Sequence, residues 1–166
     1  FEGEEPLHRL LTTLKNGSTL KDVPNLLFYE DGKIESNEER VELRFEQMPP
    51  PTFDGLPMDL YLSPYPILPV LQSRGCYWGK CTFCTHSFIY GHRYGKQRTE
   101  QMVDELESLA EKYKTKYFTF SDEAVSPHSL NDVSEEIIKR DVDIKSLALL
   151  KFEKVMDREL FEKMKQ

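Results

Sequence analysis

The sequence contains no long apolar run and no excess of positive charge. No stretch of about 18 apolar residues occurs in the chain, so we do not expect a membrane-spanning helix. The first residues also lack the charged-then-apolar pattern of a secretory signal, and a cytoplasmic setting is the default expectation. With 22 basic and 29 acidic residues the formal net charge is −7, which argues against a surface that tracks phosphates. We therefore expect a small-molecule or peptide substrate, and neither nucleic acid nor membrane as a partner.

Cysteine is scarce as well. The chain has three, Cys76, Cys81 and Cys84, and all of them lie in the stretch SRGCYWGKCTFCTH, residues 73–86. An odd number of thiols crowded into nine positions is a poor basis for a disulfide framework. A metal or cluster site in a reducing compartment explains the pattern better.

Two metal centres and one structural role could account for these thiols. A closed zinc site needs four protein ligands, and His86 is too near Cys84 in the chain to be a good fourth ligand. A four-iron cluster normally has four cysteines too, but three would leave one iron with an open position where a cofactor can bind. Cysteines that pack a core would be spread over buried faces, whereas these share a loop with Gly75 and Gly79. The open-iron cluster is the preferred interpretation.

The first part of the chain is predicted to hold a helix and a hairpin. Leucines recur at helical spacing over residues 4–15, with Pro6 in the first turn and Gly17 just past the end. Asp31-Gly32 stands between two β-prone segments, which is typical of a two-residue hairpin turn. A proline-rich linker follows over residues 38–66, with Tyr61, Tyr65 and Ile67 as candidates to dock on a core.

The remainder alternates between strands and helices. We expect strands over 67–73, 116–123 and 144–152, separated and followed by helices that begin at Thr99, at Ser129 and near Asp157. Thr99 and Ser129 are the predicted N-caps, with Asp132 completing a capping box. This order indicates parallel βα units, either in an open doubly wound sheet or in part of a barrel. Chemistry on such folds lies at the carboxyl ends of strands, where the cysteine loop and Asp122-Glu123 fall.

The motif RGCYWGKCTFC, with Phe83 before the last cysteine, resembles the cluster loop of the radical S-adenosylmethionine (SAM) superfamily. The resemblance implies that Cys76, Cys81 and Cys84 bind a [4Fe–4S] cluster, and that SAM chelates its fourth iron. It implies that Phe83 lies beside the adenine. It also matches the stretch FSDE to a segment that holds the methionyl amino group, with Asp122 and Glu123 favoured over Ser121. The chain departs from the commonest pattern, because four residues rather than three separate the first two cysteines.

More narrowly, SRGC after DLYLSPYPILPVLQ resembles the branch whose radical domain follows a cobalamin-binding domain. The implied α/β architecture is about half of a six-unit (β/α) barrel of the radical SAM type, preceded by the tail of an α/β cobalamin-binding domain. Residues 1–37 would be that tail, 38–66 the linker and 67–166 the beginning of the radical SAM domain. The chain would then be a fragment, with the residues that grip cobalamin upstream of it.

The activity implied by the resemblance is that of a radical SAM enzyme, which cleaves SAM reductively and generates a 5′-deoxyadenosyl radical. Cobalamin-dependent methyl transfer is the reaction suggested by the branch, and a flavodoxin or ferredoxin is the expected electron donor. The resemblance assigns no catalytic residue beyond those that bind cofactors. Two other functions stay open from the residues alone: an iron–sulfur electron-transfer or cluster-carrier protein, and a zinc-stabilised interaction module.

Overall fold

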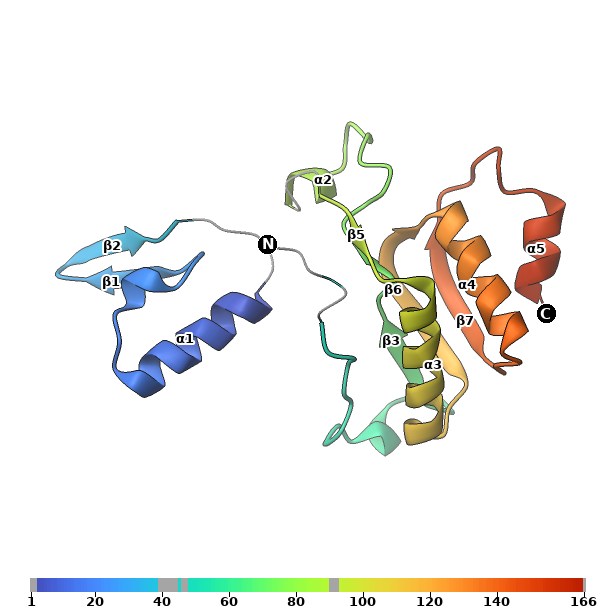
Figure 1. Ribbon diagram of the computed structural model, residues 1–166, viewed down its shortest axis with the longest axis horizontal. Coiled ribbons are helices and arrows are strands. Elements are labelled where there is room, and N and C mark those ends of the chain that lie inside the picture. The colour runs from blue at the N-terminus through green and yellow to red at the C-terminus, as the bar shows by residue number, and fades with distance from the viewer. Residues whose placement is uncertain (1–2, 39–44, 46–47, 90–92, 166) are drawn as a thin grey trace. The chain divides into compact units, whose positions relative to one another are not determined.

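The chain divides into two compact units, residues 1–43 and 44–166. The structure is a computed structural model that describes residues 3–38, 45, 48–89 and 93–165 (Figure 1). In this part of the chain no helix is both long and apolar enough to cross a membrane. The predicted linker falls partly outside the described residues, at 39–44 and 46–47.

The first unit consists of one helix and one hairpin. Helix α1 (Glu4–Asn16) ends at Gly17, which takes a left-handed conformation with φ 64° and donates its N–H to the Leu14 carbonyl oxygen. A single 3₁₀ turn, η1 (Leu20–Asp22), leads to strands β1 (Leu27–Glu30) and β2 (Lys33–Ser36), which pair antiparallel. Asp31 and Gly32 both have positive φ, as a type I′ turn requires. The predicted helix and hairpin are confirmed.

This unit buries few of its own apolar side chains. Val23 is 1% exposed, and the Asn37 side-chain amide holds the chain around it by donating to the carbonyl oxygens of Leu20 and Val23 at 2.6 and 2.7 Å. The leucine stripe of α1, by contrast, remains exposed, as do large side chains of the hairpin. The exposed residues are Leu7, Leu11, Leu14, Leu27, Tyr29 and Ile34. The amphipathic pattern therefore predicted the helix correctly, but the unit itself does not cover the apolar face.

The second unit is built on a parallel sheet of three strands in the order β3-β6-β7. These are β3 (Ile67–Val70), β6 (Tyr117–Val125) and β7 (Lys145–Leu150), and the crossovers are α3 (Thr99–Tyr113) and α4 (Pro127–Lys139). Helix α5 (Arg158–Lys165) follows β7. The predicted alternation of strand and helix is confirmed. It could be predicted because the hydrophobic period of the sequence changes from two to about 3.6 at each junction.

The helices cover one face of this sheet. Alternate residues of the strands, among them Leu68, Val70, Phe118 and Phe120, are at most 7% exposed and form one core with α3 and α4. The intervening residues point to the other face, where Ile67 is 43% exposed and Leu147 66%. Helices on a single face are typical of barrel-type winding rather than a doubly wound sheet. Closure into a barrel, and the cobalamin-domain origin of residues 1–37, stay predictions.

Both predicted N-caps in this unit need correction, whereas the third helix begins near Asp157 as predicted. The N-cap of α3 is Arg98 rather than Thr99, and the Arg98 side chain makes no capping hydrogen bond. Helix α4 begins three residues earlier than the capping box at Ser129 predicts. Ser126 is its N-cap and accepts from the Ser129 N–H at 3.2 Å, and Pro127 occupies the first turn. Proline favours the first helical position, because its fixed φ suits the helix and its missing N–H would be unpaired there.

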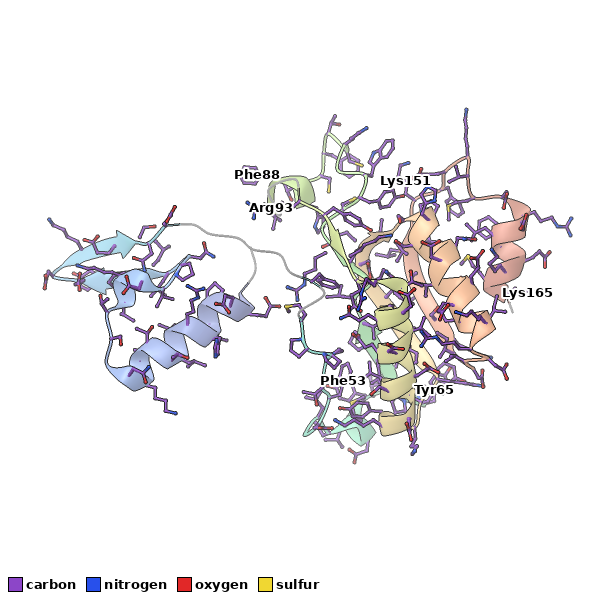
Figure 2. The ribbon with its side chains drawn as sticks, viewed as in Figure 1. Phe53, Tyr65, Phe88, Arg93, Lys151 and Lys165 are labelled. Carbon is purple, nitrogen blue, oxygen red and sulfur yellow. The ribbon has the colours of Figure 1, made fainter. Side chains whose placement is uncertain are left out.

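The described part of the linker docks on the end of α3. The Phe53 N–H donates to the Tyr113 hydroxyl at 2.7 Å, and that hydroxyl donates to Asp54 at 2.9 Å. Tyr65 stacks on Tyr117 with ring centroids 3.8 Å apart. Figure 2 labels Phe53 and Tyr65 at one end of the sheet and Lys151 at the other. Tyr65 is nevertheless 42% exposed, Ile67 43% and Tyr61 54%. The expected docking of these three side chains on the core is therefore wrong: Tyr65 packs on Tyr117, a strand residue outside the core.

Candidate functional site at the cysteine loop

The cysteine loop, residues 75–94, leaves the sheet at the carboxyl end of β3 and is closed at its base by a short ribbon. Strand β4 (Ser73–Arg74) pairs antiparallel with β5 (Gly95–Lys96), and the ladder continues where the Gln97 N–H donates to the Gln72 carbonyl oxygen at 2.9 Å. The loop also carries the short helix α2 (His86–Ile89), and residues 90–92 lie outside the described part. The base is therefore tied to the sheet on both sides.

Gly75 is fixed at this base by its surroundings. Its φ is 81°, a left-handed value that L side chains rarely adopt. A Cβ added there would lie 2.2 Å from the carbonyl oxygen of Arg93, on the opposite side of the ribbon. The residue directly before Cys76 must therefore be glycine for the two sides of the loop to come this close.

Asp122 bonds to the same base. It is 1% exposed, and its carboxylate accepts from the Gln72 N–H at 3.0 Å and from the Ser73 hydroxyl at 2.5 Å. Burial raises the pKa of Asp122, and the hydrogen bonds from Ser73 and Gln72 oppose that rise. The register of β6 slips here, since β6 advances five residues from Phe120 to Val125 while β7 advances two. Such a bulge re-aims side chains at the end of a strand.

A second buried polar group completes the base. The Gln97 side-chain amide donates to the Leu71 carbonyl oxygen at 3.1 Å and to Glu105 of α3 at 3.2 Å. Glu105 is 8% exposed, and burial raises the pKa of its carboxyl group. Gln72 and Gln97 are also buried, so the ribbon joins the sheet and α3 through polar contacts. The sequence showed no pattern that predicted this network.

The three cysteines are free thiols on the loop. Cys76 and Cys84 are half-buried and Cys81 is exposed; the Cys84 N–H donates to the Cys81 carbonyl oxygen at 3.2 Å, which closes a turn around Phe83. Among the described residues, no group of three or more His, Cys, Asp and Glu side chains is gathered as metal ligands would be. The donor set suits an iron–sulfur cluster, since thiolates are its usual ligands, and the turn gives Cys81 and Cys84 a common anchor.

The other predicted binding residues lie at different depths. Glu123 is half-buried and its carboxylate is 3.7 Å from Nδ1 of His86, which follows the last cysteine by two positions. Phe83 is 88% exposed. Because Asp122 is buried and already bonded, Glu123 is the one of the two acids that the structure brings to the cysteine loop.

The residues between the first two cysteines reach the segment that follows β7. The Tyr77 hydroxyl donates to Glu153 at 2.6 Å, and Lys151 lies 3.7 Å from the centre of the Trp78 ring. Burial, followed by the bond to Glu153, raises the pKa of Tyr77, and the same bond is the main cause that lowers the pKa of Glu153. These partners are more than 70 positions apart in sequence, and no sequence signal connected them.

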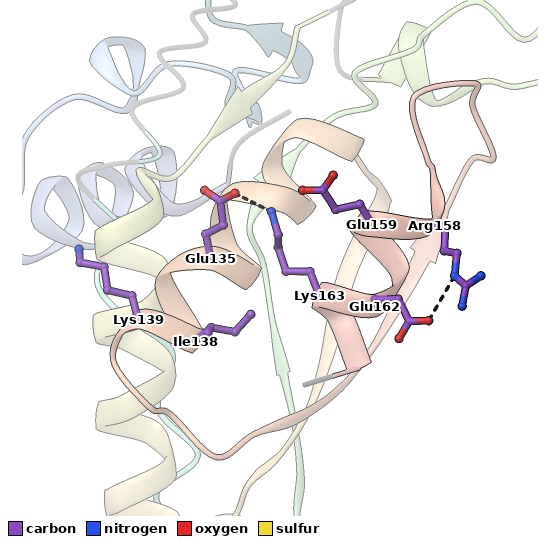
Figure 3. A pocket seen from close by; sticks show the side chains of 7 residues that line it. All are labelled: Glu135, Ile138, Lys139, Arg158, Glu159, Glu162 and Lys163. Carbon is purple, nitrogen blue, oxygen red and sulfur yellow. Dashed lines mark hydrogen bonds and ion pairs between the residues drawn. The ribbon is translucent and has the colours of Figure 1, made fainter.

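A charged hollow between α4 and α5 is separate from this site (Figure 3). Its cavity volume is about 730 Å³, and Lys163 bonds across it to Glu135 at 2.6 Å. The remaining lining residues are Ile138, Lys139, Arg158, Glu159 and Glu162. None is a cysteine, and two of its ion pairs, Lys163–Glu135 and Arg158–Glu162, join the charged groups that line it, so we interpret the hollow as a helix–helix contact and not as a candidate active site.

Comparison with known proteins finds similarity in sequence and in structure. No family model matches the chain. A protein of Pyrococcus horikoshii named an uncharacterized methyltransferase is 31% identical over 147 residues, which cover 86% of this chain and 32% of that protein. The chain thus spans about a third of the length of this relative.

Solved structures match over nearly the whole chain. The apo form of OxsB, a cobalamin-dependent SAM radical enzyme, matches with a TM-score of 0.69 at 21% identity. The match covers 98% of this chain and 24% of the OxsB chain. The radical SAM methyltransferase TsrM of Kitasatospora setae, solved with tryptophan substrate and a SAM analogue, matches with a TM-score of 0.72 at 20% identity. This match covers 98% of this chain and 34% of the TsrM chain. This chain shares their fold. Another structure of TsrM holds cobalamin and a [4Fe–4S] cluster, with a TM-score of 0.59.

Proposed function

We propose that this chain carries the cluster-binding and SAM-binding part of a cobalamin-dependent radical SAM methyltransferase. One observation carries the proposal: three free thiols share a loop at the carboxyl end of the first strand of a parallel sheet. The methyltransferase relative and the fold of OxsB and TsrM support it.

In this proposal Cys76, Cys81 and Cys84 are the cluster ligands, and the fourth iron is left for the amino and carboxylate groups of SAM. The cluster would supply the electron that cleaves SAM reductively. Glu123 would pair with the cationic amino group, because it is the acid that lies at the loop beside His86. Phe83, with its exposed ring, would lie against the adenine.

Asp122 has a different role in this proposal. Its carboxylate holds Gln72 and Ser73, and so fixes the direction in which the chain enters the loop. Cobalamin would be bound by the parent protein, with residues 1–37 belonging to the end of that domain. The substrate would be a small molecule or a peptide; in TsrM it is tryptophan. A flavodoxin or ferredoxin as electron donor and a cytoplasmic location stay predictions.

The test is anaerobic reconstitution of the chain with iron and sulfide, followed by metal analysis and EPR of the reduced protein with and without SAM. We expect about four irons per chain and a [4Fe–4S]⁺ signal whose g-values change when SAM is added. Cys76→Ala, Cys81→Ala and Cys84→Ala should each lose most of the iron. Thr82→Ala, on the same loop but without a ligand atom that iron prefers, should keep it.

Each alternative function has its own result. A cluster signal whose g-values do not change when SAM is added would favour an electron-transfer or cluster-carrier protein. Zinc bound in place of iron, with no cluster formed, would refute the radical SAM proposal and favour a zinc-stabilised module. Glu123→Gln separates the SAM contact from the cluster: the iron content should stay at the wild-type level, while the response of the signal to SAM should need a higher SAM concentration.

A further inference from the structure

The beginning of the cysteine loop is fastened at two consecutive residues. Tyr77 donates its hydroxyl hydrogen to a carboxylate oxygen of Glu153, and Trp78 receives the Lys151 ammonium over its ring. Lys151 and Glu153 are themselves 3.3 Å apart. The four side chains therefore form one closed set of contacts between the loop and the segment after β7. We call this set the clasp.

The clasp places an anchor directly after the first cysteine. Directly before it, Gly75 is held against the Arg93 backbone at the base of the ribbon. Cys76 thus lies between two residues whose positions are fixed by separate parts of the fold. Its half-buried state agrees with this confinement, whereas Cys81, farther along the loop, is exposed.

The contacts of Tyr77 and Trp78 constrain the orientation of these side chains as well as their distance from the segment after β7. A phenol that donates to a carboxylate makes a short, charge-assisted hydrogen bond, and its 2.6 Å length is in the range of such bonds. A lysine close to the face of a tryptophan is favourable when the ring is partly shielded from water. Together they constrain both the backbone turn at Tyr77 and the side on which Trp78 lies.

We propose that Tyr77 and Trp78 are positioning residues for Cys76, and that the segment after β7 sets the place of the first cysteine in the cluster site. This inference rests on the proposed function. It also gives a use to the four-residue spacer between Cys76 and Cys81, which supplies both aromatic side chains. Ligands of parallel α/β folds bind at the carboxyl ends of strands, so a substrate that contacts the end of β7 would contact the segment that holds Cys76.

The first test needs no cluster. Trp78 is the single tryptophan of the chain and is 36% exposed, so acrylamide quenching of its fluorescence reports whether the clasp is closed. In the apo protein, Tyr77→Phe and Glu153→Ala should raise the quenching constant by roughly two- to threefold. The reason is that the Tyr77–Glu153 bond ties the loop to the segment whose Lys151 covers the Trp78 ring, so that without this bond the ring becomes more accessible. Glu153→Gln should lie between wild type and Glu153→Ala, because its amide oxygen still accepts the tyrosine hydrogen bond but the charge that strengthens this bond and pairs with Lys151 is lost. Tyr117→Phe and Glu159→Ala are the matched controls outside the clasp.

The second test uses the reconstituted protein. If the clasp positions Cys76, Tyr77→Phe and Glu153→Ala should shift the g-values or the midpoint potential of the cluster. Glu153→Gln should shift them less, and both controls should keep the wild-type values. Wild-type quenching in Tyr77→Phe and Glu153→Ala would refute the clasp. Altered quenching with wild-type EPR and potential would refute its positioning role. Failure of the wild-type protein to build a cluster that responds to SAM would instead refute the proposed function, and the fluorescence test would still decide the clasp.

Discussion

Gly75→Ala should damage the base of the cysteine loop while leaving the parallel sheet folded. The new Cβ would lie 2.2 Å from the Arg93 carbonyl oxygen, far inside the contact distance of a carbon and an oxygen. The obstacle is backbone and not the end of a flexible side chain, so β4 and β5 must separate. Gly55 provides a matched control, because its φ is also 81° and a Cβ there meets nothing within 4 Å.

The expected loss can be estimated from two contributions. The left-handed conformation costs an alanine roughly 1 kcal/mol, and this applies to both variants. Gly75→Ala must in addition open the ribbon or store the clash, and losing two ladder hydrogen bonds costs about 2 kcal/mol more. We therefore expect a loss of about 3 kcal/mol in the free energy of unfolding for Gly75→Ala and about 1 kcal/mol for Gly55→Ala.

Urea denaturation followed by circular dichroism measures both losses, and iron content after reconstitution measures the effect on the loop. Gly75→Ala should bind much less iron than wild type, and Gly55→Ala the wild-type amount. The reasoning would be wrong if the two variants had the same stability within error and Gly75→Ala still took up the full cluster. That result would mean that the ribbon shifts without cost, so that the close approach at Gly75 does not determine the loop.

Four further substitutions test, by denaturation, the fold that carries the site. Glu105→Gln should stabilise the fold near pH 7. Burial raises the pKa of Glu105 above 4.5, so the folded wild-type protein holds the protonated carboxyl group at no cost below pH 4.5. As the pH rises through the raised pKa, the buried group must ionise and the free energy of unfolding falls. The gain should vanish below about pH 4. Ser126→Ala should cost about 1 kcal/mol because it removes the cap of α4, and Thr99→Ala, at a position without capping function, should cost almost nothing. Tyr113→Phe should cost about 1–2 kcal/mol, since the Phe53 N–H loses its acceptor, and a loss within error would show that water replaces the hydroxyl.

The elements that the sequence predicted are those decided by local contacts. The end of α1 at Gly17 and the turn at Asp31-Gly32 need only backbone conformations that a few residues determine. The start of α4 also had a local signal, Pro127, but the serine and aspartate at 129 and 132 gave an equally regular capping pattern farther along. The hydrophobic period therefore located each element, and the competing caps moved its boundary.

The site was predictable in its residue types and not in its contacts. Three cysteines in one loop indicate a metal or cluster site without any structure. The burial of Asp122 depends on Ser73, and the clasp depends on Glu153; these pairs are 49 and 76 positions apart. Contacts over such distances arise only when the strands are in register, so a single sequence has no period or spacing that reveals them.

Because the ribbon of β4 and β5 closes the cysteine loop at its base, changes in the length of the loop need not disturb the sheet. Two residues on each side close a segment that runs from 75 to 94, and the core strands β3 and β6 make their contacts below it. Inserting one residue into a closed segment of this length costs only about 0.04 kcal/mol of closure entropy. A lineage can therefore lengthen or shorten the intervals between thiols, and recruit new neighbours for them, while the scaffold underneath stays as it was.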